Sequence, residues 1–209
     1  MKKLVCITFV LAAAIMALTA CGQNDGGGGS PSPTPPSPTP TAPFILLADD
    51  GAMENAYKDI GYMGSVNNGD DGSMSVKEYD TSQKKTGNAS MRFTYASPGK
   101  SHWAGMALLF ETGWKSDPGS DGPDLGLYSE YTFWVKGSGG TVKFFIECDG
   151  GAQSTKFVTV EDEWQQVTLN IKDSWKYCNI MFGWACNESN PDVDGGTIEF
   201  WCDGMQFEE

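Results

Sequence analysis

The sequence predicts an all-β fold over residues 44–209, a two-sheet antiparallel jelly-roll β-sandwich. Short segments rich in β-branched and aromatic residues recur between clusters of Gly, Asp, Asn and Ser, which is typical of strands and turns. No convincing amphipathic helix interrupts them. The segment is long enough for one domain with a full hydrophobic core.

Ten strands are expected, enough to fill two sheets. They lie at 44–48, 73–79, 89–96, 103–111, 131–137, 141–149, 155–161, 164–171, 179–186 and 196–208. Successive side chains of a strand point to opposite faces, so alternation within each string predicts which residues face the core.

Two strings show this alternation. In "TVKFFIECD" (141–149) one row is apolar, and the other row is Lys143, Phe145, Glu147 and Asp149. In "WAGMALLFE" (103–111) the core row is Met106, Leu108 and Phe110, and the opposite row is Trp103, Gly105, Ala107 and Leu109. Small residues beneath one tryptophan predict a shallow trough on that outer face.

Residues 1–20 have the pattern of a secretory signal. Lys2 and Lys3 precede an apolar run that ends at Leu18, too short to span a bilayer, since a transmembrane helix needs roughly 20 apolar residues. The string "LTAC" (18–21) resembles the bacterial lipobox, which implies cleavage before Cys21 and acylation of that residue. The alternative is an ordinary cleaved signal followed by a chance cysteine.

Residues 21–43 predict a disordered stalk behind the lipidated Cys21. They are almost entirely Gly, Ser, Pro and Thr, which cannot bury enough apolar surface to offset the entropy of ordering. We therefore expect an exported bacterial lipoprotein, anchored to the membrane through Cys21, that holds its domain away from the lipid at the cell surface.

The formal net charge of -13 excludes two classes of partner. Nucleic acid needs a basic footprint, and electrostatic docking on anionic lipid needs clustered Lys and Arg. We expect a monomer, because no coiled-coil or helical segment suggests an oligomer.

Four cysteines remain once Cys6 leaves with the signal and Cys21 is acylated: Cys148, Cys178, Cys186 and Cys202. An even number in an exported chain suggests two disulfides, with three possible connectivities. Buried thiols are the alternative. Zinc is disfavoured, because close CxxC spacing is missing and the chain has one histidine.

Several strings resemble those of a known family. They are "TGNASMRFTY", "WAGMALLFE", "DLGLYSEYTFWVKG", "EWQQVTLNI" and "IMFGWAC". They are similar to carbohydrate-binding modules of the galactose-binding-like jelly-roll superfamily, with family 11 the most similar in appearance. The resemblance covers residues 44–209 and implies a non-catalytic module that binds plant-type polysaccharide, such as β-glucan, on a concave sheet face.

Such modules stack aromatic rings on sugar and place polar groups against its hydroxyls. On this basis the expected binding residues are Tyr62, Trp103, Trp114, Phe145, Glu147, Asp149, Trp175 and Trp184. Alternation with Ile180 and Phe182 would, however, turn Trp184 inward. Trp134, Trp164 and Trp201 are assigned to packing. Met63 departs from the family, which often has a second aromatic after the "GY" pair.

The resemblance also implies a structural Ca²⁺ ion. Its matching positions are Asp50 or Glu54, the turn Thr86-Gly87-Asn88, and Asp203. Carboxylates and backbone carbonyls are the oxygen ligands that Ca²⁺ prefers. The alternative is that these acids are ordinary solvated turn residues.

An enzyme is disfavoured by the motifs. His102 is the only histidine, and no G-x-S-x-G elbow, Walker loop or H-E-x-x-H string occurs. A glycosidase needs only two carboxylates, for which Glu147 and Asp149 are the candidates. A protein-binding assembly lipoprotein is the third possibility, and it predicts buried aromatics and a flat face.

Overall fold

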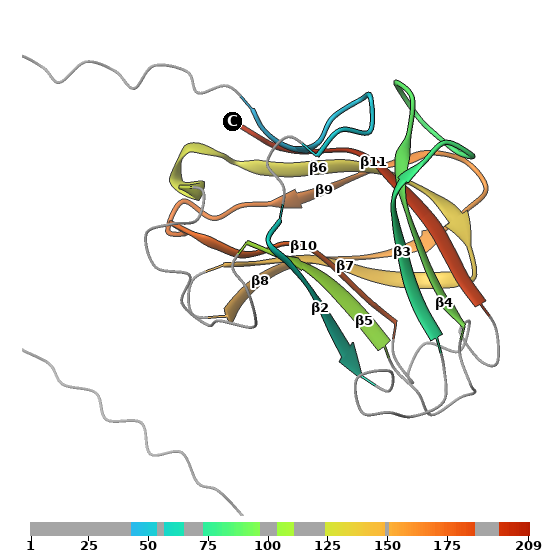
Figure 1. Ribbon diagram of the computed structural model, residues 1–209. Helices are drawn as coiled ribbons and strands as arrows, with labels where there is room; N and C mark the ends of the chain where they lie inside the picture. The colour runs from blue at the N-terminus through green and yellow to red at the C-terminus, as the bar shows by residue number, and fades with distance from the viewer. Residues whose placement is uncertain are drawn as a thin grey trace, which may run out of the picture. The chain divides into compact units, whose positions relative to one another are not determined.

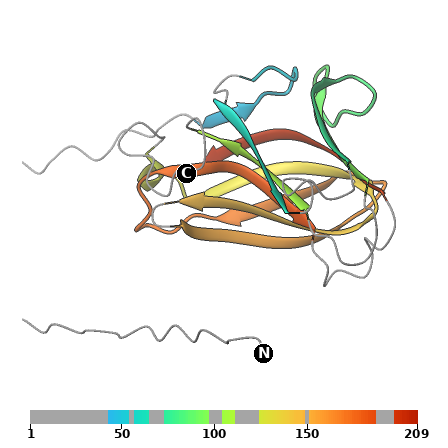
Figure 2. The ribbon, with the colours of Figure 1, turned by 60° about the horizontal axis from the view of Figure 1, so that its bottom comes forward.

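The protein folds into two antiparallel β-sheets packed face to face, as Figures 1 and 2 show. The computed structural model describes residues 43–53, 57–64, 73–96, 104–110, 124–148, 151–186 and 197–209. The predicted all-β sandwich is confirmed. Within these ranges, no helix is long and apolar enough to cross a membrane.

The six-stranded sheet has the order β3-β4-β11-β6-β9, and β1 also pairs with β11. Its strands are β1 (Phe44–Leu47), β3 (Ser73–Asp80), β4 (Ser90–Ala96), β6 (Glu130–Ser138), β9 (Gln165–Asn170) and β11 (Thr197–Glu208). One edge of β11 pairs first with β4, over Thr197 to Cys202, and then with β1, over Met205 to Phe207. The N-terminal and C-terminal strands of the domain are thus hydrogen-bonded to each other.

The five-stranded sheet has the order β2-β5-β10-β7-β8. Its strands are β2 (Asp59–Gly64), β5 (Ala104–Leu109), β7 (Gly140–Cys148), β8 (Ala152–Val160) and β10 (Cys178–Cys186). A short 3₁₀ helix, η2 (Leu125–Leu127), precedes β6, and Asp124 caps it by accepting a hydrogen bond from Gly126 N at 3.0 Å.

All ten predicted strands occur, but the sequence interpretation missed β2, "DIGYMG". Its glycines Gly61 and Gly64 weaken the strand pattern. The strand forms because β5 supplies its hydrogen-bond partners, from Asp59 opposite Leu109 to Gly64 opposite Ala104.

Aromatic rings from both sheets fill the space between them. Phe93 of β4 stacks on Phe200 of β11, with ring centroids 5.1 Å apart. Phe144 of β7 and Trp184 of β10 meet Phe200 edge-on, at 5.4 and 5.3 Å. Fully burying such a side chain stabilises the fold by roughly 1.5–3 kcal/mol, so these contacts hold the two sheets together.

All four cysteines of the domain are buried, and none of them is in a disulfide bond. In the described ranges no group of three His, Cys, Asp or Glu side chains could hold a metal ion. The structure therefore has the cysteines as buried thiols.

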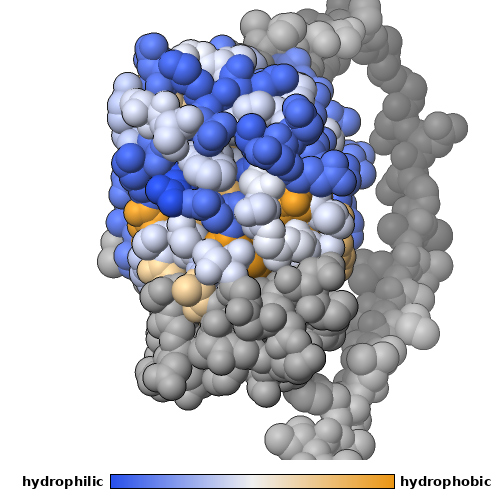
Figure 3. All heavy atoms as spheres, turned by 90° about the vertical axis from the view of Figure 1, so that its right-hand side faces the viewer, coloured by the Kyte–Doolittle hydropathy of each residue, from blue (hydrophilic) through white to orange (hydrophobic). Residues whose placement is uncertain are grey.

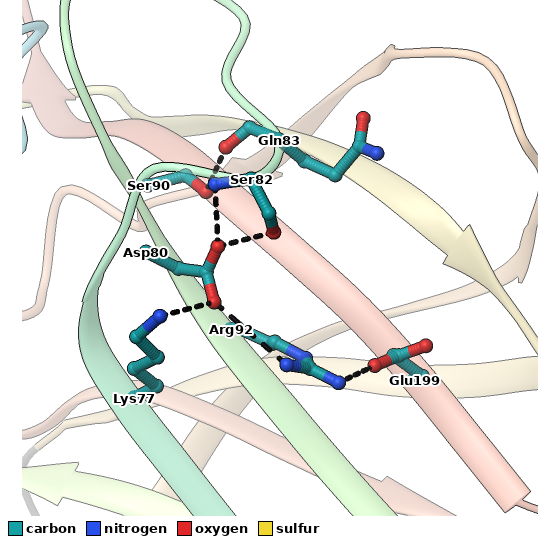
Figure 4. A network of polar contacts seen from close by, with 7 residues as sticks. All are labelled: Lys77, Asp80, Ser82, Gln83, Ser90, Arg92 and Glu199. Atoms are coloured by element: carbon teal, nitrogen blue, oxygen red, sulfur yellow. Dashed lines mark hydrogen bonds and ion pairs between the residues drawn. The ribbon is translucent and has the colours of Figure 1, made fainter.

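A polar network fastens the end of β3 to β4 and β11 (Figure 4). Asp80, 1% exposed, accepts hydrogen bonds from the backbone N–H and the hydroxyl of Ser82, and pairs with Lys77 Nζ at 3.1 Å. Arg92 lies between Asp80 and Glu199 of β11 and forms ion pairs with both. Burial alone would raise the pKa of Asp80, but the bonds from Ser82 and Lys77 outweigh it and lower the pKa to about 2.

We expect Asp80→Asn to lower the free energy of unfolding at pH 7 by about 2 kcal/mol. Because the folded pKa lies below the unfolded one, the carboxylate stabilises the fold above about pH 4. That contribution is lost as the pH falls through about 2, where wild type and variant should be equally stable. Urea unfolding across this pH range measures the difference.

Asp162→Asn is the matched control, because Asp162 pairs with Lys136 at 3.2 Å but its side chain is 95% exposed. It should change the unfolding free energy little at any pH. Equal effects of the two substitutions at pH 7 would contradict the role given to Asp80.

Candidate functional site

Three rows of side chains cross the outer face of the five-stranded sheet, because the registers of its strands align from β2 to β8. The first row is Met63, Gly105, Ala185, Lys143 and Phe157. The second is Gly61, Ala107, Gly183, Phe145 and Thr155. The third is Asp59, Leu109, Ile180, Glu147 and Gln153.

Small residues form the floor of this face, as the alternation in "WAGMALLFE" predicts. A Cβ on Gly105 would lie 2.8 Å from Met63 Cε, and one on Gly183 would lie 2.4 Å from Phe145 Cζ. Because Gly105 and Gly183 have no Cβ atom, Met63 Cε and the end of the Phe145 ring can approach the sheet at these two positions. Ala107, Leu109, Phe145 and Ile180 form an apolar cluster that is almost fully buried.

The β7–β8 side of the face is polar and accessible. Lys143 Nζ donates a hydrogen bond to Gln153 Oε1 at 3.1 Å, and Gln153 Nε2 donates one to Glu147 Oε2 at 2.8 Å. Thr155 is exposed between them on β8. We call Lys143, Glu147, Gln153 and Thr155 the polar ladder.

Phe157 of β8 lies beside the polar ladder and is 64% exposed. Its partner in the neighbouring strand is Lys143. The sequence interpretation missed Phe157, although "TKFVTVE" contained the signal. Val158 and Val160 face the core, which turns Phe157 to the outside.

Of the residues predicted to bind carbohydrate, the structure puts Phe145 and Glu147 on this face. Glu147 belongs to the polar ladder. Phe145 is only 3% exposed; the end of its ring lies over Gly183, and Lys143 Nζ lies 5.1 Å from its centroid. It is not the open stacking platform that was expected.

Three other expected aromatics are not on the outer face. Trp184 is fully buried against Phe93 and Phe200, the inward orientation that alternation allowed. Trp175 is buried in the same core cluster, and Tyr62 packs partly buried against it. Trp175 and Trp184 are therefore core residues and not open stacking platforms, whereas the binding role predicted for Tyr62 stays a prediction.

Trp103, Trp114 and Asp149 lie outside the described residues. Cys21 and Glu54 do as well. Their predicted roles stay predictions.

Trp134 and Trp201, assigned to packing, are half-buried. Neither belongs to the core cluster, so alternation along β6 and β11 places both on the outer face of the six-stranded sheet. Lys85 Nζ lies 4.0 Å from the ring centroid of Trp134, and the Arg92 guanidinium lies 5.5 Å from that of Trp201. The side of the domain on which β3 and β4 lie is mostly hydrophilic, with small separate hydrophobic spots (Figure 3).

The three segments predicted to hold calcium meet at one junction. Asp203 lies where the neighbour of β11 changes from β4 to β1, and it accepts hydrogen bonds from Lys85 N at 2.8 Å and Thr86 N at 3.1 Å. Thr86 Oγ1 donates to Asp49 Oδ1 at 2.7 Å. A Cβ on Gly87, whose φ is +58°, would lie 1.2 Å from Asp49 O, so only glycine fits there.

Asp49 rather than Asp50 reaches this junction. The Asp50 carboxylate accepts a hydrogen bond from Ala52 N at 2.8 Å within its own turn. Asp203 is fully buried, and burial together with the nearby Asp49 raises its pKa although three backbone N–H groups oppose the shift. Asp49 and Asp203 supply the carboxylate oxygens that suit Ca²⁺.

No protein-family model matches the sequence, and no curated protein matches it. Solved structures do resemble this one. The family 11 carbohydrate-binding module of the cellulosomal cellulase Lic26A-Cel5E of Clostridium thermocellum aligns with a TM-score of 0.49 and 13% identity, over 80% of this chain and 96% of that one. The Clostridium thermocellum family 11 module in complex with a β-1,3-1,4-mixed-linked tetrasaccharide gives 0.48 and 14%, over 78% and 94%.

A mutant of the family 29 module CBM29-2 gives a TM-score of 0.46 and 12% identity, over 80% of this chain and 92% of that one. The likeness is one of fold.

Proposed function

We propose that the domain binds polysaccharide without cleaving it, along β7 and β8 on the outer face of the five-stranded sheet. The observation that carries this proposal is Phe157, an aromatic ring that is 64% exposed beside the polar ladder. The ligand class is plant-type polysaccharide such as β-glucan, which the resemblance of the sequence strings supports.

A sugar ring has an apolar C–H face and a rim of hydroxyls. An exposed ring such as Phe157 can cover the apolar face, and its stacking releases water from both surfaces. An exposed apolar side chain of this size has no packing role in the fold, since Val158 and Val160 already supply the contribution of β8 to the core.

The polar ladder supplies the groups that hydroxyls need. Lys143, Gln153 and Glu147 hold one another through hydrogen bonds, so their positions are set before a ligand arrives. Each is at least partly accessible and keeps free donor or acceptor capacity for a sugar hydroxyl.

The described carboxylates of this face do not suit glycoside hydrolysis. Asp59 on β2 and Glu147 on β7 share the third row but are separated by three strand spacings, or about 14 Å. Glycosidases hold their two carboxyl groups roughly 5–9.5 Å apart. Binding therefore fits this pair better than cleavage.

Phe157→Ala should lower polysaccharide affinity at least about tenfold without unfolding the domain, because the ring contributes to binding and not to the core. The measurement is affinity electrophoresis of the detergent-solubilised full chain in gels containing β-glucans, xylan, mannan or xyloglucan. Thermal unfolding of both proteins checks that the fold is intact.

Tyr79→Ala is the matched control, because Tyr79 is 53% exposed but lies on β3 of the other sheet. It should bind like wild type. Equal retardation of wild type and Phe157→Ala by every retarding polymer would place the site elsewhere.

A second candidate function is the binding of a protein partner, as in an assembly lipoprotein. It is favoured by the burial of Phe145, Trp175 and Trp184, which leaves fewer aromatic platforms than a sugar-binding face often has. Retardation by none of the polymers would favour this function, which a cross-linking experiment on intact cells would then test.

We also propose the lipid anchor at Cys21, supported by the lipobox-like string and the stalk that follows it. Bacteria grown with radiolabelled palmitate should label the wild-type chain and leave Cys21→Ser unlabelled. The variant should also leave the membrane fraction. Labelling of the variant would contradict acylation at Cys21.

A structural Ca²⁺ ion is our proposal for the junction of Asp49 and Asp203, supported by two carboxylates that lie close together, one of them buried. Calcium at about 100 times its Kd should raise the melting temperature by roughly 5–10 °C over that in EDTA. Asp49→Asn should remove most of this difference. Identical melting curves in calcium and EDTA would mean that hydrogen bonds alone hold the junction.

A further inference from the structure

Cys148 and Cys178 lie opposite each other on neighbouring strands. Cys148 ends β7, Cys178 begins β10, and the two are direct partners in the antiparallel ladder. Both side chains belong to the core cluster, so they point to the same side of the sheet. Cys178 Sγ lies 3.6 Å from the carbonyl oxygen of Glu147, the residue before Cys148.

This arrangement suits a disulfide bond. Directly opposed residues of an antiparallel pair have Cα atoms about 4.5–5.5 Å apart, within the roughly 4.4–6.8 Å range of disulfides. Their Cβ atoms, about 4.5–5.5 Å apart, need to approach by about 1 Å. Cys148 and Cys178 form the last pair of the β7–β10 ladder, so within that ladder only the end has to shift.

The other pairings do not fit. Cys186 ends the same strand that Cys178 begins, so the eight residue steps between them span about 26 Å. Because Cys148 lies opposite Cys178, Cys186 is equally remote from Cys148. Cys202 lies on β11 of the facing sheet, where its ladder partners are Met91 and Val135, so no cysteine lies directly opposite it.

We infer that oxidation joins Cys148 and Cys178, which are thiols in the structure, in the single disulfide of this domain, and that Cys186 and Cys202 stay thiols. Each of the three connectivities open to four cysteines needs two disulfide bonds, and this domain would form only one bond. Burial raises the pKa of Cys186 to about 11 and that of Cys202 well above its usual range, which makes both poor nucleophiles.

The oxidant can be any small or protein-bound disulfide, here glutathione disulfide. One cysteine thiolate attacks it, forms a mixed disulfide and releases one glutathione thiolate. The second cysteine thiolate attacks the mixed disulfide and releases the other glutathione. The protein loses two electrons and two protons, and the glutathione disulfide takes them up as two thiols.

The burial of both sulfurs sets the timing. Cys148 is 1% exposed and Cys178 is fully buried, so an external disulfide reaches them only before the sandwich closes. The bond should form during folding and then resist reductants while the domain stays folded. It would join the last residue of β7 to the first residue of β10, next to Glu147 of the polar ladder.

The test is refolding of the full chain, with Cys6→Ser and Cys21→Ser to leave only the four domain cysteines, in a glutathione redox buffer. We expect an intact mass lower by two hydrogen atoms and a single cross-linked peptide pair, joining Cys148 to Cys178. The cross-link closes a loop of 30 positions, which should raise the melting temperature by about 5–15 °C over the reduced protein.

Matched variants separate this pair from the other two cysteines. Cys148→Ser and Cys178→Ser should keep the reduced mass and melt alike with or without dithiothreitol. Cys186→Ser and Cys202→Ser should still lose two hydrogen atoms. A cross-link between any other pair, or native protein refolded in this buffer at its fully reduced mass, would overturn the inference, and neither outcome depends on polysaccharide binding.

Discussion

The packing of aromatic rings between the two sheets is the constraint on which the rest of this structure depends. Phe93, Phe144, Trp184 and Phe200 contact one another across the interface. Because side chains alternate along a strand, each ring that enters the core commits its neighbours to the outer face. A shift by one residue in β7 would place Phe145 inside and Phe144 outside, so the core fixes the register of the outer rows.

That register decides what each face offers to a ligand. On the five-stranded sheet the floor of glycine and alanine is mostly buried, and the accessible residues beside it are the polar ladder and Phe157. On the six-stranded sheet, Trp134 and Trp201 have cationic groups close to their rings. Phe157, the most exposed large hydrophobic side chain of the described residues, is on the first face, and it carries the proposed function.

Alternation and turn residues in the sequence were enough to predict the sandwich, ten of its strands and the inward row of β7. They did not reveal β2, which depends on hydrogen bonds to β5 and not on its own pattern. The sequence predicted to which face of a strand a side chain points better than it predicted how much of that side chain is exposed. Phe145 points outward as expected, yet the end of its ring lies over Gly183, 38 positions later in the chain, and its side chain is only 3% exposed. Phe157 was predictable from its own string.

The pairing of β1 with β11 also determines how the domain carries mechanical load. Any tension applied through the segment before Phe44 enters the fold at β1, which is tied to β11 only along Phe44, Ile45 and Leu47. Leu46 and Leu47 are fully buried, so extracting the strand also exposes apolar surface. A pulling force applied there would have to break the β1–β11 ladder, in which no strand of the five-stranded sheet takes part.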